Sequence, residues 1–339
     1  GGRPAVAFGS YTVPDGELLY MRADDAEGTS WGAPVVVNSV SGSSFAGVWP
    51  SLEVVNGRPA ICAAEYDGVG ATLKFWRADD ATGNAWSSEV ALDNTLATIG
   101  DVKTSMTVLE SVPPVPAVSY RNPSSGTLYY VRANDANGAT WAAPQTNLDP
   151  TIGSGLRSTL LVVQGNPAIS YERSSTLDIY YVRANDAFGG AWGAPVAVET
   201  INSCNFPAML MADGRPAIMF SYTDGANVSQ GRIYRAGDDV GSSWSQYAVF
   251  YDTTYYTGYA ENIGGLPFVL FSDLNLNAPV SCTALRTDGL AWDSPMQVGP
   301  INSIGYTWAL AAVNGQPAFT AQTASGLPSG SDLMYSRLY

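Results

Sequence analysis

Residues 132–141 read Arg-Ala-Asn-Asp-Ala-Asn-Gly-Ala-Thr-Trp, and this order of arginine, aspartate, glycine and tryptophan recurs along the chain. The arginines that begin the copies are Arg22, Arg77, Arg132, Arg183, Arg235, Arg286 and Arg337. They are 55, 55, 51, 52, 51 and 51 residues apart. A period near fifty residues in a β-type sequence indicates a repeat array. Residues present in every copy are therefore interpreted as scaffold, and function is sought where the copies differ.

Each repeat contains four short extended segments joined by turns. The first two are joined by Asn-Gly or Asp-Gly, as in residues 56–59 and 213–216, which are strong hairpin signals. The fourth follows the tryptophan, as in residues 192–198. Four antiparallel strands repeated about seven times predict an all-β fold: one seven-bladed β-propeller domain over residues 1–339. The chain opens at a second strand and stops after a third, so we expect either three-stranded end blades or completion by flanking sequence.

The repeated turn resembles the Asp-box of the sialidase-like (BNR) propellers, Ser-x-Asp-x-Gly-x-Thr-Trp. Gly138, Thr140 and Trp141 match that motif, whereas the aspartate stands one position early, at Asp135, with Ala136 in its usual place. The whole repeat is also similar to bacterial extracellular repeats that read Asn-Gly-x-Pro-Ala-Ile-Ser-Tyr and then Tyr-Val-Arg-Ala-x-Asp. This resemblance implies a secreted or cell-surface propeller and says little about activity.

The charge and composition of the chain exclude several classes of function. The net charge is −14 with only 16 lysines and arginines, so a nucleic-acid partner is not expected. The sequence contains no run of 18 apolar residues, so membrane insertion is not expected. Histidine is absent, which removes the commonest general base and metal ligand. The Asp/Asn turns carry oxygen ligands, but side-chain-to-backbone bonding explains them, so we predict no metal and no cofactor.

The seven arginines invite comparison with the arginine triad of sialidases. Because they share one repeat position, they are spread over the blades and cannot converge on one pocket. They are interpreted as structural, as are the turn tryptophans. No catalytic constellation can be identified, so the chain is predicted not to be an enzyme.

The loops of a blade lie on two faces. Connections between strands one and two and between three and four are regular in this chain, whereas the 2–3 loops and the blade-to-blade 4–1 loops vary. Variable loops are the usual place for binding. Candidates on that face include Phe45, Trp49, Asp101, Lys103 and Arg157; the ligand-binding residues predicted there are Tyr66, Arg121, Glu172, Arg173, Tyr255 and Tyr306.

We therefore expect a secreted or cell-surface, non-enzymatic binding or adhesion propeller that recognises a glycan or a protein. Low charge density and aromatic rings favour a neutral sugar or a protein surface. Two alternatives stay open. The first is that the chain is a structural subunit of an extracellular assembly, with neighbouring subunits or flanking domains. The second is that it is a carbohydrate-active enzyme that uses two carboxylates.

Overall fold

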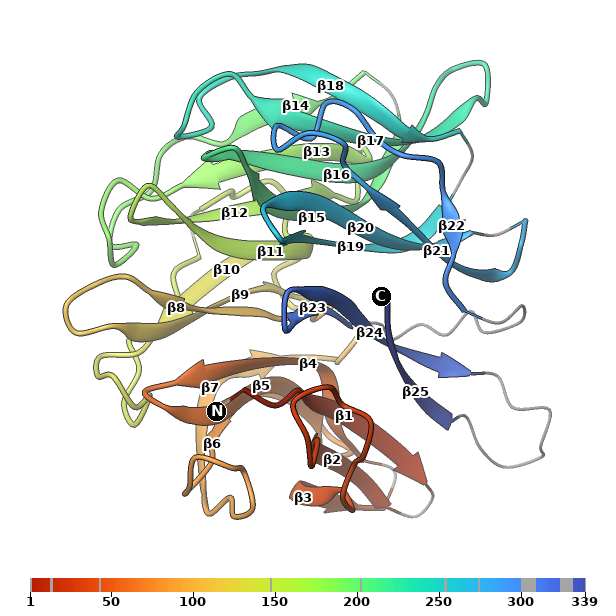
Figure 1. The fold of residues 1–339 in the computed structure, drawn as a ribbon. Coiled ribbons are helices and arrows are strands. Elements are labelled where there is room, and N and C mark those ends of the chain that lie inside the picture. Colours follow the sequence, from red (N-terminus) through yellow and green to blue (C-terminus); the bar gives the residue numbers. More distant parts are fainter. Residues whose placement is uncertain are drawn as a thin grey trace. The chain divides into compact units, whose positions relative to one another are not determined.

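The computed structural model describes residues 2–12, 15–42, 44–146, 148–201, 203–252, 255–273, 275–299, 309–323 and 332–338. These residues form seven antiparallel sheets and no helix, so none of them belongs to a helix that could cross a membrane. The fold class is all-β, a seven-bladed β-propeller, as predicted (Figure 1).

The first three sheets take up residues 5–132. Their strands are β1 (Ala5–Thr12), β2 (Asp15–Arg22) and β3 (Val35–Ser41); β4 (Phe45–Val55), β5 (Arg58–Tyr66), β6 (Ala71–Arg77) and β7 (Ser88–Leu96); and β8 (Ser105–Leu109), β9 (Val115–Asn122) and β10 (Thr127–Arg132).

The other four sheets follow in the same order. Their strands are β11 (Leu156–Val163), β12 (Asn166–Arg173), β13 (Asp178–Arg183) and β14 (Val196–Glu199); β15 (Ser203–Ala212), β16 (Arg215–Thr223), β17 (Ser229–Ala236) and β18 (Trp244–Tyr251); β19 (Tyr255–Ile263), β20 (Leu266–Asp273), β21 (Ala278–Thr283) and β22 (Met296–Gln297); and β23 (Ala309–Val313), β24 (Gln316–Thr323) and β25 (Asp332–Arg337).

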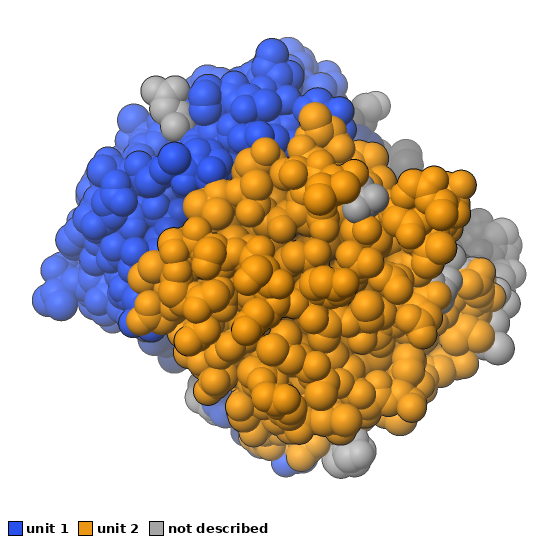
Figure 2. Space-filling model, turned by 90° about the horizontal axis from the view of Figure 1, so that it is seen from above, with its two compact units in different colours: residues 1–175, 182–195 blue, residues 176–181, 196–339 orange. Residues whose placement is uncertain are grey.

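The chain divides into two compact units, coloured separately in Figure 2. Unit 1 comprises residues 1–175 and 182–195, and unit 2 comprises residues 176–181 and 196–339. Within the described residues, the first and last sheets have three strands, which is one of the two expected arrangements of the end blades.

The third sheet also has three strands, which the sequence pattern did not predict. Gln145 exchanges two backbone hydrogen bonds with Tyr130 in β10, at 3.1 and 2.7 Å, and Ala142 N–H donates to the Arg132 carbonyl at 3.0 Å, but the described residues between Trp141 and β11 form no strand. After Pro144 the chain reads Gln-Thr-Asn, whereas Val-Val-Val follows Pro34 at the same point of the first repeat. Glutamine and asparagine have lower strand propensity than valine, and the fourth strand is lost here.

The second strand of each repeat forms the core. In β5, the seven residues from Pro59 to Glu65 are all buried, and β12 and β16 show the same pattern. Their Pro-Ala-Ile runs carry small or apolar side chains on both faces, so other strands can pack against either face. The three cysteines, at positions 62, 204 and 282, are buried.

An aspartate organises each repeated turn between the third and fourth strands. The Asp135 carboxylate accepts hydrogen bonds from the backbone N–H groups of Asn137, Ala139 and Thr140 at 2.8–3.1 Å. Burial alone would raise the pKa of Asp135, but these bonds outweigh it and lower the pKa. The turn residues are thus explained by hydrogen bonding, and the described residues contain no group of three metal-ligating side chains.

The tryptophan and glycine of each turn join one sheet to the sheet before it. Trp141 Nε1–H donates to the carbonyl of Gly138 at 2.8 Å, and its ring lies 5.0 Å from that of Phe75 in β6. Gly138 has φ +69°, and a Cβ added there would lie 2.6 Å from Phe75 Cε1. The same contact joins Gly189 and Trp192 to Tyr130 in β10. The repeated residues therefore act as joints between blades.

Three of the repeated arginines close the hairpin between the first and second strands. Arg77 Nε–H donates to the Val55 carbonyl at 2.9 Å, and its Nη2 donates to that of Asn56 at 3.0 Å. Arg183 makes the same two bonds, to Val163 and Gln164, and Arg235 repeats them at 3.2 and 3.4 Å. These contacts support the structural interpretation of the arginines.

Replacing Trp141 by alanine is expected to lower the free energy of unfolding by about 3 kcal/mol, because the substitution removes a large ring packed between two sheets. Chemical denaturation of the variant and the wild type measures this loss. Ligand binding below the melting temperature should stay unchanged; binding lost at unchanged stability would assign Trp141 to a site instead.

Candidate functional site

The two edges of the sheets are unequal. Five of the first-to-second-strand turns have two residues, at 56–57, 164–165, 213–214, 264–265 and 314–315. At the opposite edge, which we call the variable edge, the second strands end and the first strands begin. Its connections differ in length and sequence, from 42–44 and 67–70 to 97–104. Regularity at one edge and diversity at the other agree with the expected asymmetry of the loops.

Charged residues gather at two repeat positions of the variable edge. The fifth residue after the proline at the start of the second strand is Gly9, Ala64, Arg121, Glu172, Ser221 and Ser272 in the first six repeats. The sixth residue before the end of β4, β8, β11 and β15 is Trp49, Lys103, Arg157 and Phe206. Among these ten described residues, the four charged ones belong to the third and fourth repeats. The repeats therefore differ in charge at these two positions.

The charged residues form two ion pairs. Arg157 Nη1 lies 2.7 Å from Glu172 Oε2, and the Glu172 side chain is only 1% exposed. Arg121 Nη1 lies 3.3 Å from Asp101 Oδ2, whose side chain is 60% exposed. The Arg121 side chain is 15% exposed, and its buried Nε has no hydrogen-bond partner among the described residues. One pair is thus enclosed, and the other opens to solvent.

Lys103 adds a further positive charge to this group. Its burial, together with the positive charge of Arg157, lowers the pKa of Lys103 to about 8. The next residue, Thr104, donates its hydroxyl to the carbonyl of Trp49 at 2.7 Å. Trp49, which has φ +51°, occupies the same repeat position as Lys103 in the sheet before. This bond joins the backbone of Trp49 to the residue that follows Lys103.

Hydrogen bonds between sheets hold these strands in register. Ser119 and Ser158 share a buried hydrogen bond of 3.0 Å that joins β9 to β11. Ser105 Oγ accepts the Leu160 N–H at 3.0 Å and joins β8 to β11. Arg121 and Lys103 lie two residues from the serine of their own strand, and Arg157 precedes Ser158. We name the set Asp101, Lys103, Arg121, Arg157 and Glu172 the charged cluster.

Of the six predicted ligand-binding residues, the structure places Arg121 and Glu172 in two separate ion pairs, with Asp101 and Arg157. Both lie within strands, in β9 and β12, because pairing with the third strand extends further than the sequence pattern indicated. Tyr66 ends β5; its hydroxyl donates to the Gly68 carbonyl at 3.1 Å and its ring lies 6.4 Å from Phe45. The backbone of Tyr255 begins β19. The Tyr255 side chain and Tyr306 lie outside the described part of the chain.

Arg173 belongs to a clamp between sheets. Its Nε–H donates to Asp149 Oδ2 at 2.8 Å, and the same oxygen accepts the Tyr171 hydroxyl at 2.7 Å. The equivalent clamp one repeat earlier links Asp93 to Tyr120 at 2.7 Å and to Asn122, which occupies the position of Arg173, at 3.0 Å. Recurrence in successive repeats indicates that this contact of Arg173 serves the scaffold.

Lys103 and Arg157 were not among the six predicted ligand-binding residues. The signal that finds them is a comparison of the first strands in register, where they replace the aromatic residues Trp49 and Phe206.

Glu65, Glu172 and Asp101 are the carboxylates that the sequence offers for the enzymatic alternative, and each is paired with a cation. Glu65 pairs with Lys74 at 2.8 Å, Glu172 with Arg157 and Asp101 with Arg121.

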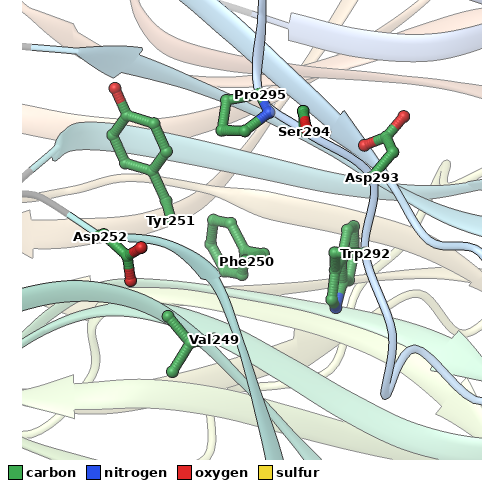
Figure 3. Close-up of a pocket in the computed structure, with 8 residues that line it drawn as sticks. All are labelled: Val249, Phe250, Tyr251, Asp252, Trp292, Asp293, Ser294 and Pro295. Atoms are coloured by element: carbon green, nitrogen blue, oxygen red, sulfur yellow. The ribbon is translucent and has the colours of Figure 1, made fainter.

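A separate pocket of about 400 Å³ lies in unit 2, between the end of β18 and the segment that follows Trp292 (Figure 3). Val249, Phe250, Tyr251 and Asp252 line one side of it, and residues 292–295 line the other. The rings of Phe250 and Trp292 are 5.5 Å apart. A second pocket, around Tyr234 and Trp244, lies between the corresponding elements of the fourth and fifth repeats. Their walls contain turn tryptophans that recur in the repeats, so both pockets are interpreted as products of the scaffold.

Comparisons with known proteins identify the fold without a close relative. No family model matches the chain, and no curated protein matches it. Among solved structures, it is similar to the BP39L lectin from Burkholderia pseudomallei, with TM-score 0.70, 11% identity and coverage of 99% of this chain and 92% of that one.

Two carbohydrate-active enzymes share the fold as well. An ulvan lyase of polysaccharide lyase family PL25 has TM-score 0.63 and 13% identity over 97% of this chain and 91% of its own. The Hadza microbial sialidase Hz136 has TM-score 0.53 and 14% identity over 95% and 74%. At these identities the likeness shows the fold alone, because one fold hosts many functions.

Proposed function

We propose that this protein is a non-enzymatic binding module that recognises a glycan through its variable edge. The observation that carries the proposal is the charged cluster, which replaces neutral or aromatic residues at two repeat positions in adjacent sheets. The scaffold contacts recur from repeat to repeat, whereas these ion pairs do not. Binding residues on a regular scaffold usually lie where the loops and their neighbours vary.

The lectin with the same fold supports a binding function, whereas the ulvan lyase and the sialidase show that this fold also carries enzymes. Two features favour binding. The carboxylates at the variable edge are paired with cations, and the chain has no histidine. We further propose that the chain is a sialidase-like, variant Asp-box repeat protein that works outside the cell or at the cell surface.

A structural subunit of an extracellular assembly is the second candidate. The last sheet ends at β25, which pairs only with β24 among the described residues. An open edge strand can accept a neighbour. Light scattering distinguishes the candidates: an ordered oligomer formed without added glycan supports the assembly, and a monomer supports the binding module.

Glycan-array binding of the purified chain tests the proposal. Replacing Glu172 by glutamine removes the carboxylate that pairs with Arg157, so we expect binding to weaken about tenfold, the usual effect of losing one charge-assisted contact. The matched control is Glu89→Gln, which removes an exposed carboxylate that pairs with Lys74. Equal binding by both variants, or turnover of a bound glycan, would contradict this function.

A further inference from the structure

The second pocket has a volume of about 330 Å³ and lies in unit 2, where the end of β14 meets β17 and β18. The scaffold forms a pocket in two corresponding places, but different side chains line the two. Tyr247 lines the second pocket, at the third position after a turn tryptophan. Four of the other five turns with a tryptophan have proline at that position, namely Pro34, Pro144, Pro195 and Pro295. The tyrosine is therefore a departure from the repeat.

Tyrosines also replace carboxylates around a cation in this repeat. In the second sheet, Lys74 Nζ lies 2.8 Å from Glu65 Oε1 and 3.0 Å from Glu89 Oε1. The same three repeat positions in the fifth sheet hold Arg232, Tyr222 and Tyr247. The Arg232 Cζ atom lies 3.3 Å from the centre of the first tyrosine ring and 4.8 Å from that of the second. Two cation–π contacts thus take the place of two ion pairs.

Tyr247 is positioned by its neighbours and is still half exposed. Its ring stacks on that of Tyr234, with 5.1 Å between the ring centres and 13° between the planes. Arg232, which also contacts this ring, donates its Nε–H to Gln230 Oε1 at 2.9 Å. Tyr247 nevertheless remains 50% exposed. An aromatic ring that is already held in place loses little side-chain freedom when a ligand stacks on it.

A carboxylate lines the same pocket. Glu199 Oε2 accepts the Tyr234 hydroxyl at 2.9 Å, and its Oε1 accepts the Ile201 N–H at 2.9 Å. In the third and fourth sheets, the clamp carboxylate instead binds a tyrosine of the second strand. Phe220, which has no hydroxyl, stands at that position in the fifth sheet. A carboxylate has about four lone-pair sites, so Glu199 can accept further hydrogen bonds from a ligand.

We infer that the second pocket is a further binding site, which takes a neutral saccharide. The sugar ring stacks on Tyr247, and the sugar hydroxyl groups donate to Glu199. The volume of the pocket falls among those of small-molecule sites, which are about 300–1,000 Å³. This site shares no residue with the charged cluster, so it goes beyond the proposed function and does not depend on it.

The charges at the pocket select against ionic ligands. The Glu199 carboxylate repels an anion at close range. Arg232 already contacts the Tyr247 ring, so its guanidinium repels a second cation that approaches the same ring. A neutral sugar avoids both costs, and it combines an apolar ring face with several hydroxyl donors.

Calorimetric titration of the purified chain tests this site. The neutral probes are cellotriose, mannotriose and galactotriose, and the charged probes are a galacturonic acid trimer and choline. Tyr247→Ala and Glu199→Gln should each weaken binding of a neutral trisaccharide about tenfold, whereas Tyr247→Phe, which keeps the ring, should bind as the wild type does. The matched control is Glu89→Ala, which changes the same strand position in the second sheet and should leave binding unchanged.

The outcomes separate this site from the proposed function. Equal binding of the neutral trisaccharides by the wild type and Tyr247→Ala overturns the site; if Glu172→Gln then weakens that binding, the variable edge is the glycan site. Binding weakened by Tyr247→Ala but not by Glu172→Gln supports the second pocket and contradicts the variable edge. No binding of any neutral trisaccharide at millimolar concentration, or a preference for choline or the acidic trimer, also overturns the site. Melting temperatures show whether each variant is folded.

Discussion

Replacing Gly189 by alanine is expected to lower the free energy of unfolding by about 3 kcal/mol, as the sum of backbone strain and overpacking. Gly189 has φ +69°, where a side chain is strained. The added Cβ would also lie 2.7 Å from Cε1 of the fully buried Tyr130 ring. Neither the turn nor the ring has room to move, because Trp192 packs on the same tyrosine.

Gly165→Ala is the matched control for this prediction. Gly165 has φ +74°, nearly the same backbone conformation, but a Cβ there would meet no atom within 4 Å. It should cost only the backbone term of about 1 kcal/mol. Urea denaturation of both variants measures the difference. If both variants lost the same free energy of unfolding, the contact between sheets would contribute nothing. The turn glycine would then not serve to join one sheet to the next.

Replacing Asp149 by alanine is expected to cost about 3–5 kcal/mol, because it removes one partner of a buried ion pair. The Asp149 side chain is 1% exposed and accepts hydrogen bonds from Arg173, Tyr171 and the Thr151 N–H. The comparison is Asp213→Asn, which breaks an ion pair with Arg235 whose carboxylate is 61% exposed. That exposed pair should be worth less than about 1 kcal/mol.

The same aspartate gives the clamp a pH dependence. Burial would raise the pKa of Asp149, but the hydrogen bonds from Arg173, Tyr171 and Thr151 outweigh it and lower the pKa. Because the pKa of Asp149 is lower in the folded state than in the unfolded state, its ionised form stabilises the fold at pH values above the unfolded-state pKa. This stabilisation is lost as the pH falls through the folded-state pKa. Below about pH 4 the wild type should therefore lose stability faster than Asp149→Ala. Parallel pH profiles of the two proteins would contradict the clamp.

Much of the fold could be predicted from the sequence because the same turn residues recur at a nearly constant spacing. Asp135, Gly138 and Trp141 mark a turn whose copies appear at a fixed spacing, and their contacts in the structure are local or reach only the preceding repeat. The prediction was wrong for the fourth strand of the third sheet, where the residues after Pro144 lack strand propensity. The clamp at Arg173 was also not foreseen, because its partner lies 24 residues away, in the connection between β10 and β11.

The sequence by itself determined the all-β class, the number of repeats, the turns that punctuate them and the edge at which the copies diverge. Local hydrogen bonds and strand propensity are enough to fix these features. The tertiary structure alone decided which diverging residues meet. Asp101 and Arg121 are 20 residues apart along the chain, Arg157 and Glu172 are 15 residues apart, and the structure joins each two in an ion pair. Convergence of side chains depends on how strands stack between sheets, which no short stretch of sequence encodes.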